Sequence, residues 1–255
     1  MIKFFRRIRY TLMEQNKTGK YLKYAFGEIV LVVIGILIAL SINNWNETKL
    51  ERKIEKEYIV SLIEDLETDS TRLSYLVRRF DTAELQLDTV LKMYHKLALG
   101  YNDTLRRNLP AVINFPDFTY TDRTMQQLKN SGSMRYIVNK KVSNGILDYD
   151  IKVKHLLTSY IPDLTFYYEN SNQMWFEVVD NEAFDTDSKI MSISEMEKGT
   201  KNYLLKDDEA SLGKFNNIIR NFKNVTATVR DTEKELLIKA TGLITLLKKE
   251  YDLNK

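Results

Sequence analysis

The stretch AFGEIVLVVIGILIALSINNW, residues 25–45, carries a single charge, Glu28. Counted from Tyr24 to Trp45, it would form roughly 33 Å of α-helix at about 1.5 Å per residue, enough for a bilayer core of about 30 Å. The stretch therefore predicts one transmembrane helix over residues 24–45. The alternative is a helix buried in the core of a soluble protein.

The flanks of this helix predict its orientation. Interfacial aromatic side chains are expected at Tyr21 and Tyr24 before the apolar run and at Trp45 after it. The first 23 residues carry seven Lys or Arg and one acid, whereas both signs mix beyond the helix. Because basic flanks stay in the cytoplasm and no small-residue cleavage site follows, we expect an uncleaved signal-anchor. Residues 46–255 are then periplasmic, and the protein belongs in a bacterial inner (cytoplasmic) membrane.

Residues 1–23 form a basic, amphipathic and cytoplasmic segment in this interpretation. At about 100° per residue, the apolar side chains of its first part fall on one side and the basic ones on the other. A helix of this kind lies in the membrane interface. The residues expected at lipid headgroups are Lys3, Arg6, Arg7 and Arg9. The alternative is a basic terminus that only sets the topology.

Beyond the span, apolar residues recur at alternating spacings of three and four, which predicts long helices. Residues 46–99 contain neither Gly nor Pro, so the first helix is expected to continue out of the membrane and to end at Gly100. Its inward-facing row, here called a seam, consists of Ile59, Leu62, Leu66, Asp69, Leu73, Leu76, Phe80, Ala83, Leu87, Val90, Tyr94 and Leu97. Only Asp69 breaks the apolar pattern.

Two further seams complete the predicted bundle. The second consists of Val142, Ile146, Tyr149, Val153, Leu156, Tyr160, Tyr167 and Met174, with a kink or break at Pro162. The third consists of Leu212, Phe215, Ile219, Phe222, Thr226, Val229, Glu233, Leu236, Ala240, Leu243 and Leu247. These coiled-coil-like spacings suit an antiparallel bundle better than a parallel dimer. The predicted fold is all-α: a single N-terminal transmembrane helix followed by a long antiparallel helical bundle over residues 46–255.

Two segments connect the long helices. Residues 101–138 contain Pro110 and Pro116 and predict a short helix from Asp122 to Asn130, ended by Ser131 and Gly132. We expect residues 100–138 at the end of the bundle far from the membrane. Residues 180–207 are polar and predict a loop.

The residues also resemble a known family. The string NKTGKYLKYAFGEIVLVVIGILIALSINNWNE, Asn16–Glu47, is similar to the signature of an uncharacterised family of single-pass membrane proteins of Bacteroidota, a domain of unknown function. The string TMQQLKNSGSMRYIVNKKV, Thr124–Val142, resembles that family's second recurrent stretch. Together they cover about a fifth of the chain. The resemblance implies a membrane anchor in a bacterial envelope and supplies no activity or catalytic residue.

One face of the predicted span suggests a contact site. Glu28, Gly35, Ala39 and Ile42 lie on that face and Asn43 adjoins it. Gly35 with Ala39 forms a small-xxx-small pair that permits close approach of another helix. The interpretation is self-association or docking on another membrane protein. The alternative is that Glu28 reaches the interface or pairs with Lys20, Lys23 or a headgroup.

A second candidate site is a group of aromatic residues after Pro162. Tyr167, Tyr168 and Trp175 would line a ligand or partner pocket. Aromatic residues at helical spacing also form ordinary core, and this alternative stays open.

The sequence excludes several classes of chemistry. With no cysteine there is no thiolate metal site, disulfide or cysteine nucleophile. The two histidines, His95 and His155, lie in no recognisable motif, and no phosphate-binding or nucleophile-elbow motif occurs. The acids of residues 180–187 lack the spacing of a calcium loop, and basic residues beyond the span alternate with acids. We therefore expect no catalytic residue, cofactor, metal or nucleic-acid partner, and no enzyme.

The expected function is that of a scaffold or accessory subunit acting through protein–protein contacts. The expected partners are membrane lipids and either a second copy of the chain, in a homo-oligomer, or another envelope protein. The alternative is a periplasmic small-ligand sensor that signals through a partner membrane protein, because helical bundles can hold ligands between their helices.

Overall fold

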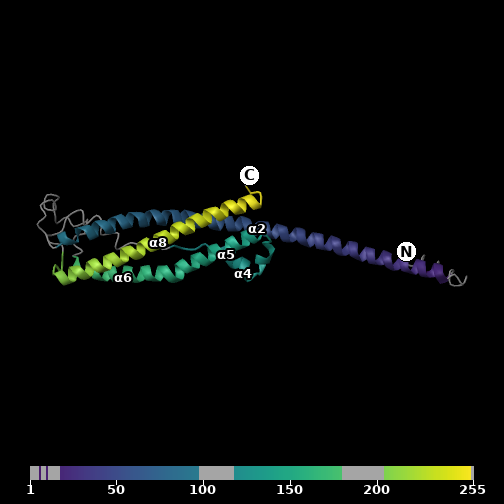
Figure 1. Cartoon of the computed structure of the whole chain (residues 1–255), viewed down its shortest axis with the longest axis horizontal. Helices are drawn as coiled ribbons and strands as arrows, with labels where there is room; N and C mark the ends of the chain where they lie inside the picture. Colours follow the sequence, from purple (N-terminus) through teal and green to yellow (C-terminus); the bar gives the residue numbers. More distant parts are fainter. Residues whose placement is uncertain (1–5, 7–9, 11–17, 98–117, 180–203, 254–255) are drawn as a thin grey trace, which may run out of the picture. The chain divides into compact units, whose positions relative to one another are not determined.

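The computed structural model describes residues 6, 10, 18–97, 118–179 and 204–253. The helices in these ranges are α2 (Thr18–Leu97), α4 (Arg123–Asn130), the 3₁₀ turn η2 (Ser133–Tyr136), α5 (Lys140–His155), the π turn η3 (Leu156–Tyr160), α6 (Ile161–Val178) and α8 (Glu209–Glu250) (Figure 1). No strand occurs in the described ranges, where an isolated bridge joins Val179 and Leu204. The all-α prediction is confirmed.

The chain divides into two compact units, residues 1–57 and 58–255. In the first unit, α2 carries an apolar stretch that is long enough to cross a membrane, and none of this stretch is buried. Large apolar side chains from Phe26 to Ile42 are exposed. A helix that leaves so many apolar side chains uncovered has the composition of a membrane anchor. As predicted, α2 runs through the exit of the apolar stretch without interruption.

The second unit is built on the three seams. In α2, the seam residues from Ile59 to Val90 are all buried, and in α8 the whole predicted seam from Leu212 to Leu247 is buried. These rows join the buried residues of α5 and α6 in one hydrophobic core. The spacing of three and four puts each row on one helix face, which explains why the seams could be assigned from the sequence.

Polar contacts between the helices fix their directions. Along α8, Lys223 pairs with Asp88, Lys234 with Asp81 and Lys248 with Glu67, all on α2. The numbers rise on α8 and fall on α2, so the two helices are antiparallel. The bridges from α8 to α5 descend in the same way, from Lys152–Glu235 to Asn139–Glu250. Figure 1 shows α8 alongside α5 and α6. The antiparallel prediction is thus confirmed for α8 against α2 and against α5, whereas α2 and α5 run in the same direction.

The helix around Pro162 differs from the prediction. The chain stays helical from α5 through η3 into α6, and Pro162 lies in the first turn of α6. Proline has no backbone N–H, which a helix tolerates in its first turn, and the wider π turn just before it changes the hydrogen-bond pattern. Such a turn inserts a residue, so the buried positions move to Leu164, Ser171, Trp175 and Val178. The predicted seam residues Tyr167 and Met174 are only half-buried.

The short helix and its caps follow the prediction. α4 begins after Asp122 and ends at Ser131, and Gly132 adopts the left-handed conformation with φ 67°. This conformation favours glycine because it lacks a Cβ. The side chain of Asn139 accepts hydrogen bonds from the N–H groups of Lys141 and Val142 and so caps α5.

Candidate functional site

The predicted contact face of the span lies on the exposed part of α2. Gly35, Ala39 and Asn43 are exposed and Glu28 is partly exposed. A Cβ added at Gly35 would meet nothing within 4 Å. Trp45 is exposed, and the ammonium of Lys49 lies 5.5 Å from the centre of its ring. In the described structure, this face is open to lipid or to another helix.

Some predicted positions lie outside the description. Tyr21 and Tyr24 belong to α2, but their side chains are not described. The side chain of His95 is likewise not described, and Arg6 is exposed. Further positions outside the described residues are Lys3, Arg7 and Arg9, the predicted helix end at Gly100, and the acidic residues 180–187.

The aromatic candidates lie largely in the core of the bundle. Trp175 is buried, and its ring centre lies 6.5 Å from that of Phe215 in α8. Tyr168 is half-buried, 6.4 Å from the ring centre of Phe222. Tyr167 also packs at the edge of the core. The structure thus places Trp175 and Tyr168 in the packing of α6 against α8 and Tyr167 at the edge of the core.

A cluster of buried polar side chains joins α2, the segment before α4, and α5. We call it the acidic cluster, and its centre is Asp65 and Asp69, one turn apart on α2 and both about 98–99% buried. Asp65 accepts hydrogen bonds from the N–H of Thr124, 2.9 Å, and from Arg123, 2.6 Å. Asp122, the N-cap residue of α4, makes no side-chain cap. Asp65 therefore caps α4 from a neighbouring helix.

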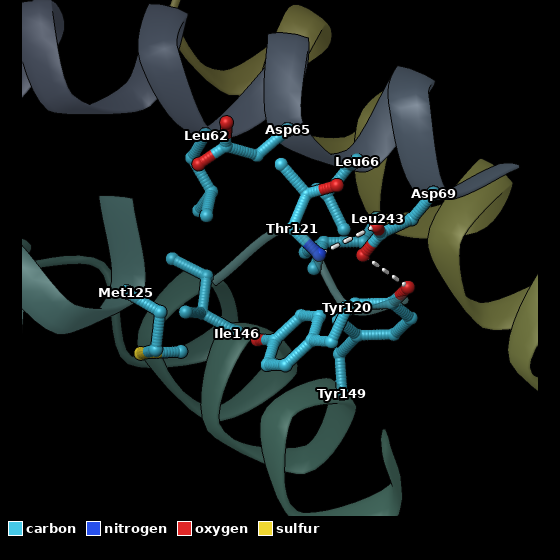
Figure 2. A pocket seen from close by; sticks show the side chains of 10 residues that line it. All are labelled: Leu62, Asp65, Leu66, Asp69, Tyr120, Thr121, Met125, Ile146, Tyr149 and Leu243. Atoms are coloured by element: carbon cyan, nitrogen blue, oxygen red, sulfur yellow. Dashed lines mark hydrogen bonds between the residues drawn. The ribbon is translucent and has the colours of Figure 1, made fainter. Parts of the chain in front are cut away.

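Asp69 connects three parts of the chain (Figure 2). One carboxylate oxygen accepts from the N–H of Thr121, 2.9 Å, and the other accepts from the hydroxyl of Tyr149 in α5, 3.0 Å. Burial raises the pKa of Asp69, and the hydrogen bonds from Thr121 and Tyr149 limit the rise. Burial and the nearby charge of Asp69 raise the pKa of Tyr149, so this hydroxyl stays a donor. Asp69, the one polar residue of the first seam, thus has a hydrogen-bond donor at each of its carboxylate oxygens.

The cluster continues to Asp150 on α5. Its Oδ2 accepts from Lys129, 2.5 Å, and Lys154, 3.0 Å, and its Oδ1 accepts from the hydroxyl of Tyr120, 3.2 Å. Burial works to raise the pKa of Asp150, but the hydrogen bonds from the two lysines outweigh it and hold the pKa below its usual value. Tyr120 packs edge-on against Tyr149, with ring centres 6.2 Å apart.

These contacts correct the expected place of the connecting segment. Thr121 and Thr124 are bonded to Asp69 and Asp65, near the start of α2 in the second unit, and hydrogen bonds from Ser133 and Ser131 lower the pKa of the Tyr58 hydroxyl. Residues 118–136 therefore lie at the end of the bundle where α2 enters, not at the far end. The expected position was wrong because the chain comes back to this end of the bundle before α4, a return that the sequence left open. Residues 98–117 lie outside the described structure.

The space inside the acidic cluster is small. A cavity of about 10 Å³ borders Asp65, Asp69, Tyr120 and Met125, which is room for a single water molecule. Binding sites for drug-sized ligands usually measure about 300–1,000 Å³. In the described residues, no three acidic or histidine side chains gather as metal ligands. Because N–H and O–H groups point at these carboxylates, the arrangement suits the joining of chain segments.

The signal for this site was present in the sequence but incomplete. Asp69 was the only position of the first seam without an apolar or aromatic residue, and a buried carboxylate requires donors. Asp65 carried no comparable signal, because acids are frequent on the outer faces of helices. The groups that donate to these carboxylates, from Thr121 to Lys129, come after a connecting segment whose path could not be predicted from the sequence.

Comparison with known proteins adds a family match. No curated protein and no solved structure matches the chain. Residues 28–146 match DUF6090, described as a family of unknown function. The matched part is somewhat less than half of the chain. It includes the exposed apolar stretch, both acids of the acidic cluster, α4 and the first part of α5, and it ends before α6 and α8, so the chain is similar to this family over its first half.

Proposed function

We propose that this protein is a single-pass protein of the bacterial inner membrane that holds its helical bundle in the periplasm and acts as a scaffold or accessory subunit. The observation that carries the proposal is the continuity of α2, Thr18–Leu97, which includes both the exposed apolar stretch and a seam of the bundle. The basic residues that precede the apolar stretch support a cytoplasmic N-terminus.

The proposed mode of action is contact rather than chemistry. The polar groups of the acidic cluster bind one another, and the cavity among them has room for one water molecule. The proposed contact surface is the exposed face of α2 that carries Gly35 and Ala39. Small side chains at these positions suit close packing of a second membrane helix. In this proposal, Tyr21, Tyr24 and Trp45 set the depth of the span, and the N-terminal basic residues contact lipid headgroups.

A crosslinking experiment tests this contact. The chain has no cysteine, so Asn46→Cys provides a single thiol just beyond the span for oxidative crosslinking in membranes. We expect a disulfide-linked homodimer whose yield falls at least several-fold with Gly35→Leu plus Ala39→Leu. The matched control, Val30→Leu plus Val33→Leu, changes the opposite helix face and should leave the yield unchanged.

The outcomes separate the partners. Loss of the dimer only in the Gly35 and Ala39 variant supports self-association through this face. A second envelope protein that co-purifies with the wild type, and is lost in the same variant, supports the accessory-subunit form. If neither contact forms, or if both pairs of substitutions act alike, the proposal is wrong.

A second candidate function is that of a small-ligand sensor, and the observation that favours it is the π turn η3. Turns of this kind are frequent at functional sites, and in this one Ser159 contacts the ring of His155 at 3.2 Å. A thermal-shift screen of the full chain against common metabolites tests it. A ligand that raises the midpoint of the wild type, but not that of Ser159→Ala, would favour sensing; no shift would count against it.

A further inference from the structure

The carboxyl group of Glu233 lies in the core of the bundle. It occupies a seam position of α8 between Val229 and Leu236, with 1% of its surface exposed. Its Oε2 has no hydrogen-bond partner among the described residues. A leucine would pack well at this seam position, whereas an ionised carboxylate with an unpartnered oxygen is very unfavourable in an apolar core. The residue is therefore a candidate for a role other than packing.

Surface ion pairs fix the level of Glu233 in the bundle. Lys234, the next residue, pairs with Asp81 of α2 at 3.0 Å, and Glu235 pairs with Lys152 of α5. Adjacent residues of α8 thus contact both neighbouring helices. The Glu233 side chain enters the core between those two contacts, where separation of α8 from α2 or α5 would admit water.

Other ionisable groups near this level have partners of their own. The ionisable groups of the neighbouring elements at this level include Asp81 and Glu84 of α2, Lys152, Lys154 and His155 of α5, and Tyr160 of η3. Arg230 pairs with both acids of α2, Lys154 pairs with Asp150, and His155 contacts Ser159 and the ring of Tyr160. Burial alone raises the pKa of Glu233 to about 8.

We propose that Glu233 is a proton-operated switch for the packing of α8 against α2 and α5. With the carboxyl group protonated, α8 packs along its full seam. When the proton leaves, the carboxylate requires water, and the middle of α8 moves away from its neighbours to admit it. Because burial favours the uncharged form of a carboxyl group, low pH favours the closed bundle and high pH favours the opened one.

The expected pH dependence follows from the two states of the glutamate. In an unfolded chain it releases its proton near pH 4.3, whereas the folded form keeps it up to about pH 8. Between these values the folded form holds more protons, so the folding equilibrium constant falls about tenfold per pH unit. Above the folded pKa of about 8, Glu233 is ionised in both states, and the folding equilibrium constant no longer falls with pH.

The test measures the opening of α8 in the full chain in detergent micelles. Because the chain lacks cysteine, Thr82→Cys on α2 and Ile238→Cys on α8 provide two spin labels for distance measurement by electron paramagnetic resonance. At pH 6 we expect one narrow distance distribution. At pH 9 we expect a broader distribution that extends to longer distances.

Matched variants decide the interpretation. In a Glu233→Gln or Glu233→Leu background, the distribution should stay narrow at both pH values, whereas Glu235→Gln, two residues further and exposed, should behave like the wild type. Denaturant unfolding should show that the folding constant of the wild type falls about fiftyfold more than that of Glu233→Leu from pH 6 to pH 8, because half of the folded glutamates are ionised at pH 8. If the wild type and both Glu233 variants respond to pH alike, the proposal is overturned.

Discussion

Removing the carboxyl group of Asp69 should release residues 118–136 from the bundle. In Asp69→Ala, the N–H of Thr121 and the hydroxyl of Tyr149 each lose an acceptor, at 2.9 and 3.0 Å in the wild type. Tyr149 is buried, so its hydroxyl cannot turn to bulk water. A hydrogen bond to a charged group contributes about 1.5–3 kcal/mol, and a buried neutral donor left without an acceptor costs about 1–3 kcal/mol, so two lost hydrogen bonds cost several kcal/mol.

We therefore expect Asp69→Ala to lower the free energy of unfolding by about 3–5 kcal/mol. This net value includes the desolvation cost of burying the carboxyl group, which the variant no longer has. Asp69→Asn keeps one acceptor oxygen and should cost about half as much. The control is Glu67→Ala, which removes a carboxylate two residues away on α2. Glu67 is exposed and pairs with Lys248, so its removal should cost about 0–1 kcal/mol.

The assay combines urea unfolding with hydrogen exchange of peptides from residues 118–136, both on the full chain in detergent micelles. In Asp69→Ala these peptides should exchange much faster than in Glu67→Ala, while peptides from the α6–α8 contact keep their protection. The reasoning fails if the two variants unfold at the same urea concentration, or if residues 118–136 exchange as slowly in Asp69→Ala as in the wild type.

Three further changes have expected outcomes. Phe222→Ala leaves a cavity beside Tyr168 in the fully buried seam of α8 and should cost about 3–5 kcal/mol in urea unfolding; an effect below about 1 kcal/mol would contradict the packing. Asn139→Ala removes the cap of α5 and should cost about 1 kcal/mol, whereas Asn139→Asp, which retains an acceptor, should recover most of it. The lowered pKa of Asp150 means that its ionised form stabilises the fold above the unfolded pKa near 3.9, and that this contribution is lost as the pH falls through the lower folded value. Asp150→Asn should therefore flatten the acid side of the stability profile, and an unchanged acid side would refute the role of the lysine contacts.

Much of the fold could be predicted because apolar spacing determines which helix face is buried. The seam of α8 was predicted completely, even with Thr226 and Glu233 in it, because the surrounding apolar positions outweigh two polar ones. The seam after Pro162 was not, because the π turn shifts the pattern by a residue and leaves no separate mark in the sequence. Local patterns describe single helices well and irregular turns poorly.

The acidic cluster shows why the rest required a structure. Asp69 was visible as an exception in an apolar seam, but its partners Thr121 and Tyr149 lie 52 and 80 residues away in the chain. Donors at such separations come together only through the path of the connecting segment, which no spacing rule supplies. Asp65 was hidden for a further reason: the capping of α4 by a residue of another helix replaces the usual local cap at Asp122.

The most direct test of the account is the side of the membrane on which each part of the chain lies. Gln15→Cys and Ile238→Cys are prepared separately in the cysteine-free chain and treated with a membrane-impermeant maleimide in spheroplasts. The account predicts that Ile238→Cys is labelled in intact spheroplasts, that Gln15→Cys is labelled only after lysis, and that both proteins sediment with membranes. Labelling of Ile238→Cys only after lysis, or recovery of the chain in the soluble fraction, would contradict it.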